Sequence, residues 1–145
     1  MTKIQVIEVN GTPYSKGLAL PLFASPVCAG RPFPADSTLD QNIDLNEFLI
    51  KNPTATFFVR VEGESMLNAG IHPGDILIVD KSLDPRPNNI VIAVINGEFL
   101  VKRRITECGT KYLVPDNPAA DRIELNKYDQ VEIWGVVTWV IHKVK

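Results

Sequence analysis

Apolar and polar residues alternate along much of the chain beyond residue 54, which is the period-two pattern of β-strands. The alternation is regular where Phe57, Val59 and Val61 occupy every second position. Residues 75–80 and 90–95 contain nearly continuous apolar runs instead, as in strands that are buried on both faces. The pattern predicts a mainly β domain. Its further strands are expected at residues 112–114, 122–125 and 131–143.

A tight hairpin is predicted where Asn96 and Gly97 separate the run at 90–95 from residues 98–105. Both residue types tolerate a positive φ, which a type I′ turn requires at its two central positions. Before the strands, a short helix is indicated by Asp44 and Glu47, a capping-box-like pair followed by helically spaced apolar residues.

The first 40 residues differ in composition, because five of the eleven prolines lie between Thr12 and Pro34. Proline lacks a backbone donor and interrupts strand pairing. We therefore expect an extended N-terminal arm over residues 1–40 and one β-rich domain over residues 41–145. The arm also carries leucines and phenylalanines, so we expect it to dock on its own domain or on a partner.

The charge is nearly balanced, since 15 Lys and Arg face 17 Asp and Glu and give a net charge of −2. Such a chain is not expected to bind nucleic acid through phosphate neutralisation alone. No apolar run approaches the roughly 20 residues of a membrane helix, and the charged start does not resemble a signal peptide. We expect a cytoplasmic protein with no membrane contact.

The chain contains two cysteines, Cys28 and Cys108, and two histidines, His72 and His142. Neither pair has zinc spacing, and two cysteines in a chain without an export signal are typical of free thiols. We therefore expect no metal and no cofactor.

Ser65 is a candidate nucleophile, because it follows a predicted strand and stands next to Gly63-Glu64. Most serines in such positions are turn or capping residues, so the assignment depends on a base. His72 and His142 lack an obvious acidic partner in the sequence. Lys102, inside the strand after the Asn-Gly turn, is the alternative base if burial or nearby cations lower its pKa.

Three segments together resemble the LexA/UmuD family of self-cleaving serine/lysine peptidases. Residues 63–66 with 70–80 resemble the serine region of that family, and residues 97–103 resemble its lysine strand. Residues 27–30 resemble its self-cleavage sequence. The helix at 43–50 and the ending at 134–139 are also similar to UmuD-like members, so the resemblance covers about residues 20–145.

The resemblance implies a β-rich peptidase fold in which Ser65 is the nucleophile and Lys102 the base. It places the scissile bond at Ala29–Gly30 and an oxyanion hole at the backbone N–H groups of Glu64 and Ser65. With 29 residues before Gly30, we expect no DNA-binding domain there, which resembles the UmuD-like branch. That branch implies a homodimer, a RecA–single-stranded-DNA filament that promotes cleavage, and a UmuC-like Y-family polymerase for error-prone lesion bypass in the SOS response.

Other interpretations are less favoured by the residues. Cys28 lies in the proline-rich arm without a nearby histidine, which disfavours a thiol nucleophile and a lipoprotein signal. A signal peptidase also uses a Ser/Lys pair but needs a membrane anchor. A dimerising module that has lost cleavage has no need for Ser65, Lys102 and the Ala29–Gly30 bond together.

Overall fold

The computed structural model describes residues 4–7, 18–23, 29–30, 39–116, 122–125 and 131–145. The chain divides into two compact units, one formed by Met1–Gly11 with Asn52–Lys145 and the other by Thr12–Lys51. Cys28 lies outside the described residues.

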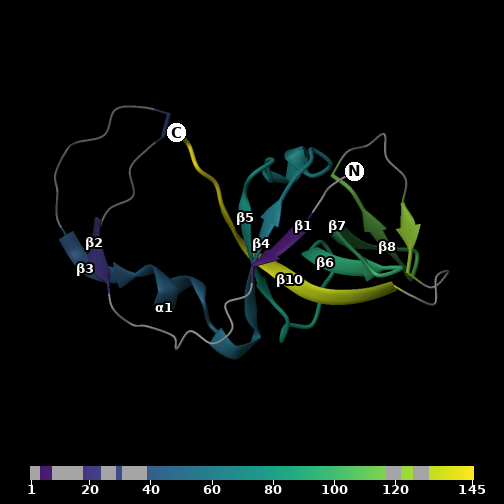
Figure 1. Ribbon diagram of the computed structural model, residues 1–145, viewed down its shortest axis with the longest axis horizontal. Coiled ribbons are helices and arrows are strands. Elements are labelled where there is room, and N and C mark those ends of the chain that lie inside the picture. The colour runs from purple at the N-terminus through teal and green to yellow at the C-terminus, as the bar shows by residue number, and fades with distance from the viewer. Residues whose placement is uncertain (1–3, 8–17, 24–28, 31–38, 117–121, 126–130) are drawn as a thin grey trace. The chain divides into compact units, whose positions relative to one another are not determined.

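The larger unit contains an eight-stranded sheet whose paired strands are all antiparallel (Figure 1). The mainly β fold predicted from the sequence is confirmed. In sheet order the strands are β1 (Ile4–Ile7), β4 (Thr56–Val61), β5 (Ile76–Asp80), β10 (Val131–Ile141), β6 (Ile90–Ile95), β7 (Glu98–Glu107), β8 (Thr110–Val114) and β9 (Ile123–Glu124). Two short 3-10 turns, Pro53–Ala55 and Leu67–Ala69, flank β4.

The central strands β5 and β6 are buried on both faces, as their continuous apolar runs predicted. In β6, Ile92 packs into one hydrophobic cluster, whereas its neighbours Val91 and Ala93 pack into a second one. The first cluster contains Val59, Val61, Met66, Ile71, Leu77, Val79, Ile92 and Val101. The second contains Val91, Ala93, Leu113 and Val136.

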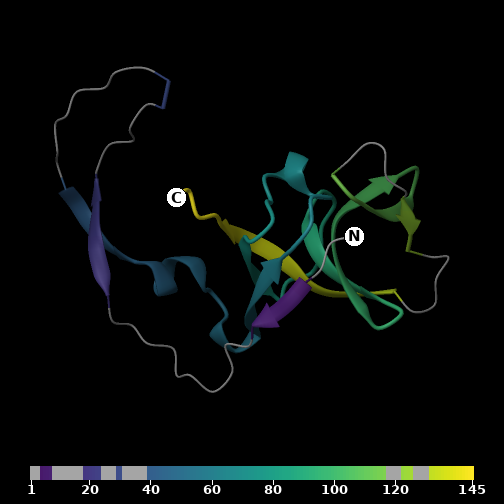
Figure 2. The ribbon, with the colours of Figure 1, turned by 45° about the horizontal axis from the view of Figure 1, so that its top comes forward.

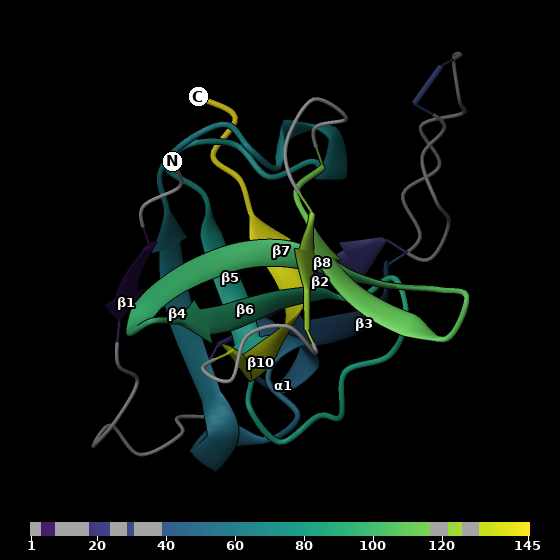
Figure 3. The ribbon, with the colours of Figure 1, turned by 90° about the vertical axis from the view of Figure 1, so that its right-hand side faces the viewer.

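The β6–β7 hairpin has the predicted turn, because Asn96 and Gly97 have φ angles of 51° and 80°. Figure 3 shows β6 and β7 running side by side from this turn, with β8 following β7. A second turn of the same kind joins β7 to β8, where Cys108 and Gly109 also have positive φ angles. Cys108 is an exposed free thiol.

The smaller unit pairs β2 (Ala19–Phe23) with β3 (Leu39–Asp44), and the helix α1 (Leu45–Leu49) follows. Asp44 caps this helix by accepting a hydrogen bond from the Asn46 backbone N–H at 2.9 Å. The capping role inferred for Asp44 is therefore confirmed, although the helix begins only at Leu45. Leu18, Leu20 and Leu22 are exposed on this unit.

Three strands, β1, β2 and β3, were not anticipated from the sequence. The strand β1, purple in Figure 2, lies along β4 in the main sheet. The pairing of β2 with β3 occurs despite Pro21, since a two-stranded ribbon leaves one side of each strand without a ladder partner. The helices of the described part of the chain are too short and too polar to cross a bilayer.

Candidate active site

Ser65 lies in the connection between β4 and β5, at the turn that the sequence singled out. Gly63 has a φ of 96°, a left-handed conformation that glycine adopts without steric cost, and it reverses the chain just before Ser65. Ser65 is half-buried, whereas the preceding Glu64 is exposed. Ser65 therefore lies between the buried core and the solvent-exposed surface.

Met66 anchors this turn in the core. Its side chain is only 1% exposed and belongs to the first hydrophobic cluster. Its carbonyl oxygen accepts hydrogen bonds from the N–H groups of Ala69 (3.0 Å) and Ile71 (3.2 Å). Because Met66 is fixed on both counts, the backbone of the adjacent Ser65 is fixed as well.

Lys102 occupies the middle of β7, opposite Val91 of β6. Its side chain is half-buried, and burial lowers the pKa of its ammonium group from the ordinary value of 10.5. The sequence offered burial or the nearby arginines as causes of such a lowered pKa. Burial is the cause in the structure, and the charge of Arg103 is compensated by Asp116.

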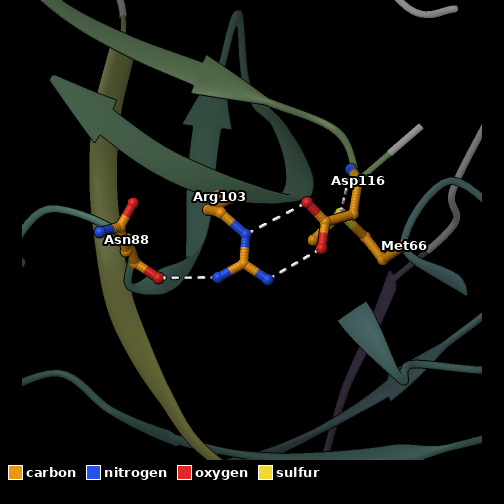
Figure 4. Close-up of polar contacts among 4 residues, drawn as sticks. All are labelled: Met66, Asn88, Arg103 and Asp116. Atoms are coloured by element: carbon orange, nitrogen blue, oxygen red, sulfur yellow. Dashed lines mark hydrogen bonds and ion pairs between the residues drawn. The ribbon is translucent and has the colours of Figure 1, made fainter. Parts of the chain in front are cut away.

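A chain of polar contacts connects the residues that follow the two candidates (Figure 4). The Arg103 guanidinium donates to both carboxylate oxygens of Asp116, at 3.1 and 2.8 Å, and to the carbonyl oxygen of Asn88 at 2.9 Å. The Asp116 backbone N–H lies 3.3 Å from the sulfur of Met66. Asp116 therefore ties the Ser65 turn to the strand that carries Lys102.

Asp116 was missed in the sequence analysis, although it is central to this connection. Asp116 follows the end of β8 by two residues. It lies near Arg103 because β8 pairs with β7 so that Val114 is opposite Arg103. The interaction with Asp116 also raises the pKa of Arg103, so this arginine stays charged.

The predicted cleavage residues Ala29 and Gly30 lie in the smaller unit, and both are exposed. A Cβ atom added at Gly30 would meet no heavy atom within 4 Å. These two residues are therefore accessible, and the cleavage of their bond by Ser65 stays a prediction.

The expectation that the histidines lack an acidic partner is wrong. The Nδ1 atom of His142 lies 2.7 Å from Oδ1 of Asp75, and the His72 backbone N–H donates to Oδ2 at 2.8 Å. Burial opposes ionisation of Asp75, but these hydrogen bonds outweigh it and lower the pKa of the carboxyl from 3.8. The His72-Pro-Gly-Asp75 spacing is a turn signal for the contact between His72 and Asp75, whereas the contact between His142 and Asp75 depends on how β10 pairs with β5.

Comparison with known proteins identifies the family. A profile of the Peptidase S24-like family matches residues 21–138, which include both candidate catalytic residues and the predicted scissile bond. The chain belongs to this peptidase family, and the resemblance to the LexA/UmuD peptidases is confirmed.

Individual relatives agree with this assignment. The protein ImpA of Salmonella typhimurium is 42% identical over 127 residues, covering 86% of this chain and 85% of the relative. The protein MucA of Escherichia coli is 35% identical over 147 residues, covering 94% and 92%. The LexA repressor of Clostridioides difficile is 39% identical over 146 residues and covers 100% of this chain and 67% of the repressor.

Proposed function

We propose that this protein is a serine peptidase that cuts its own chain at Ala29–Gly30, with Ser65 as nucleophile and Lys102 as base. The observation that carries the proposal is the half-buried Lys102, whose lowered pKa favours a neutral amine on a strand tied to the Ser65 turn. A neutral amine accepts a proton, whereas an ammonium group does not. Membership of a peptidase family supports the same chemistry.

The reaction proceeds in two steps. The Lys102 amine takes the proton from Ser65 Oγ as this oxygen attacks the carbonyl carbon of Ala29, and backbone N–H groups of Glu64 and Ser65 stabilise the oxyanion. The C–N bond then breaks, and Lys102 returns the proton to the Gly30 nitrogen, which becomes a new N-terminus. In the second step Lys102 takes a proton from a water molecule as the water oxygen attacks the carbonyl carbon of the Ala29 ester. The bond to Ser65 Oγ then breaks, Lys102 returns the proton to Oγ, and Ala29 leaves as a new C-terminal carboxyl group.

We further propose that residues 1–40 form the arm that carries the substrate bond and residues 41–145 form the peptidase and dimerisation domain. The trimmed chain then acts as a homodimeric accessory subunit of a UmuC-like Y-family polymerase in the cytoplasm during the SOS response. A RecA–single-stranded-DNA filament would promote cleavage. The UmuD-like relatives support this role. The exposed apolar end of β10, with Trp139, Val140 and Ile141, supports a shared surface.

The nucleophile is tested by incubating the purified chain at alkaline pH, or with RecA filament, and identifying fragments by mass spectrometry. The parent chain should yield a fragment that begins at Gly30, and Ser65→Ala should yield none while its circular dichroism spectrum stays unchanged. Ser82→Ala is a matched control, because it removes another hydroxyl and leaves the candidate pair intact. Cleavage by Ser65→Ala at the same bond would contradict the proposal, and an uncleaved parent chain would favour a cleavage-inactive dimerising module.

A further inference from the structure

Two histidines and one aspartate converge at the end of the sheet where β5 begins and β10 ends. One ring nitrogen each of His72 and His142 and one carboxylate oxygen of Asp75 lie within 4.8 Å of one another. The two imidazole rings are stacked obliquely, with centroids 4.7 Å apart. From the sequence we expected no metal, because neither the two cysteines nor the two histidines have a zinc-binding spacing.

The backbone holds the three residues in place. Asp75 is 3% exposed, its N–H donates to the His72 carbonyl at 3.1 Å, and its own carbonyl accepts from the Val61 N–H at 2.9 Å. His142 directly follows Ile141, which pairs with Ile76 next to Asp75. The cluster is thus fixed by the register of β10 on β5 and by the turn before β5.

The chemistry of these groups matches that of a metal site. Two imidazoles and a carboxylate are the ligand set of several zinc sites, with bonds of about 2.0–2.2 Å, and a water molecule completes a tetrahedron. Such bonds place ligand atoms roughly 3.3 Å apart. In the structure Oδ1 of Asp75 lies 2.7 Å from His142 Nδ1 and Oδ2 lies 3.7 Å from His72 Nδ1, so each ring nitrogen is already close to this spacing from a carboxylate oxygen. Both imidazole side chains are 48% exposed, so the rings have room to adjust and an ion can enter from solvent.

We propose that His72, Asp75 and His142 form a binding site for a divalent transition-metal ion of the zinc type. The bound ion would replace the direct contacts between the histidines and Asp75, and it would fasten the end of β10 to the turn before β5. This site is separate from the proposed Ser65 and Lys102 pair, and its existence does not depend on self-cleavage.

The test is calorimetric titration of Zn²⁺ alone into the full 145-residue chain, with Cys28 and Cys108 replaced by serine so that thiols cannot bind the ion. We expect one ion per chain. His72→Gln, His142→Gln and Asp75→Asn should each weaken binding about tenfold or more, since even the loss of an outer-shell partner has effects of that size. Asp84→Asn is the matched control, because it removes one exposed carboxylate elsewhere and should leave the affinity unchanged.

A second measurement needs no substitution at the site and therefore does not depend on a variant folding. The chain contains two histidines, both in the cluster, so their imidazole proton signals in NMR spectra report on it directly. Both signals should shift together and saturate at one equivalent of Zn²⁺. The proposal is overturned if no saturable heat is observed, if His142→Gln binds like the parent chain, or if one imidazole responds without the other.

Discussion

At the scale of single residues, Lys102 and Arg103 are neighbours in β7 whose pKa values shift in opposite directions. Arg103 keeps its charge through a bidentate ion pair with Asp116, in which the side chains are 28% and 20% exposed. Burial instead disfavours the charged form of Lys102. The alternation of the strand separates the two side chains, so that Arg103 is held in its ion pair and Lys102 can take the proton-transfer role proposed for it.

The pH dependence of self-cleavage follows from the direction of the Lys102 shift. Below the lowered pKa the amine is mostly protonated, so each unit of rising pH should increase the neutral fraction, and the rate, about tenfold until the pKa is approached. Cleavage without RecA should therefore accelerate from pH 7 towards pH 10. The measurement is the rate of appearance of the Gly30 fragment against pH.

Two variants of Lys102 serve as controls for this profile. Lys102→Arg retains the positive charge but does not deprotonate in this range, and Lys102→Ala removes the amine, so both should be inactive at every pH. A flat profile in the parent chain, or an active arginine variant, would show that another group is the base.

The Asp116 bridge predicts a second effect at this scale. Asp116→Asn removes the charged partner of a partly buried guanidinium and should lower the free energy of unfolding by about 1–3 kcal/mol. It should also slow self-cleavage, because the Ser65 turn loses its tie to β7. Urea denaturation and the rate of fragment release measure the two effects.

A matched comparison is available in the exposed pair of Arg122 and Glu107. Glu107→Gln makes the same chemical change where solvent screens the interaction, so stability and cleavage should barely change. Equal effects of Asp116→Asn and Glu107→Gln would show that the bridge has no special role.

How far single residues could be predicted depended on whether their partners are local. Ser65 and Lys102 stood in recognisable motifs, and the helix cap at Asp44 involves a residue two positions away. The contact between Asp75 and His142 joins residues 67 positions apart, and it exists only once β10 pairs with β5. Nothing in the local sequence of either residue indicates the other.

At the scale of elements, β10 packs tightly against β5 at Gly135, where there is no room for a side chain. A Cβ atom at this position would lie 2.5 Å from Cγ1 of the fully buried Val79 and 3.4 Å from the Asp80 carbonyl oxygen. The neighbouring irregularity in the pairing of β10 with β6, between Ile133 and Gly135, lies at the same place. A side chain here would force β10 away from β5.

Gly135→Ala should therefore destabilise the protein by about 1–3 kcal/mol, the range for overpacking a dense core. Val79→Ala leaves a cavity and is destabilising alone, but it removes the atom that the new methyl group would meet. The double variant should be more stable than the sum of the two single effects implies, as measured by thermal or urea unfolding. If the effects of Gly135→Ala and Val79→Ala on stability simply add, the clash with Val79 is not the cause of the destabilisation by Gly135→Ala.

The turns show which elements could be predicted. Asn96-Gly97 was identified because asparagine and glycine favour positive φ. The equivalent Cys108-Gly109 turn was not, because cysteine has no such preference and adopts φ 51° only where the β7–β8 ladder requires it. Likewise β2 and β3 were not predicted, because the prolines of residues 1–40 indicated an extended arm without paired strands.

At the scale of the whole molecule, the N-terminal strand belongs to the larger unit although the proposed scissile bond lies in the smaller one. The strand β1 pairs with β4 over four residue pairs, from Ile4 opposite Val61 to Ile7 opposite Phe58. Cleavage at Ala29–Gly30 would therefore break the covalent link between β1 and the rest of the sheet, so that only strand pairing holds β1 in place. If the fragment leaves, β4 becomes an edge strand.

Hydrogen exchange should report this change in particular amides. The Val61 N–H donates to the Asp75 carbonyl on the β5 side, so by strand alternation the amides of Phe58 and Arg60 point towards β1. In the full chain these two amides should be protected, and in a chain that begins at Gly30 they should exchange faster. The amides of Phe57 and Val59, which point towards β5, are internal controls and should keep their protection in both chains, since β5 is present in each.

Equal protection of Phe58 and Arg60 with and without residues 1–29 would show that pairing with β1 does not protect this edge of the sheet from exchange. Faster exchange at all four positions would mean instead that the truncated sheet as a whole is less stable.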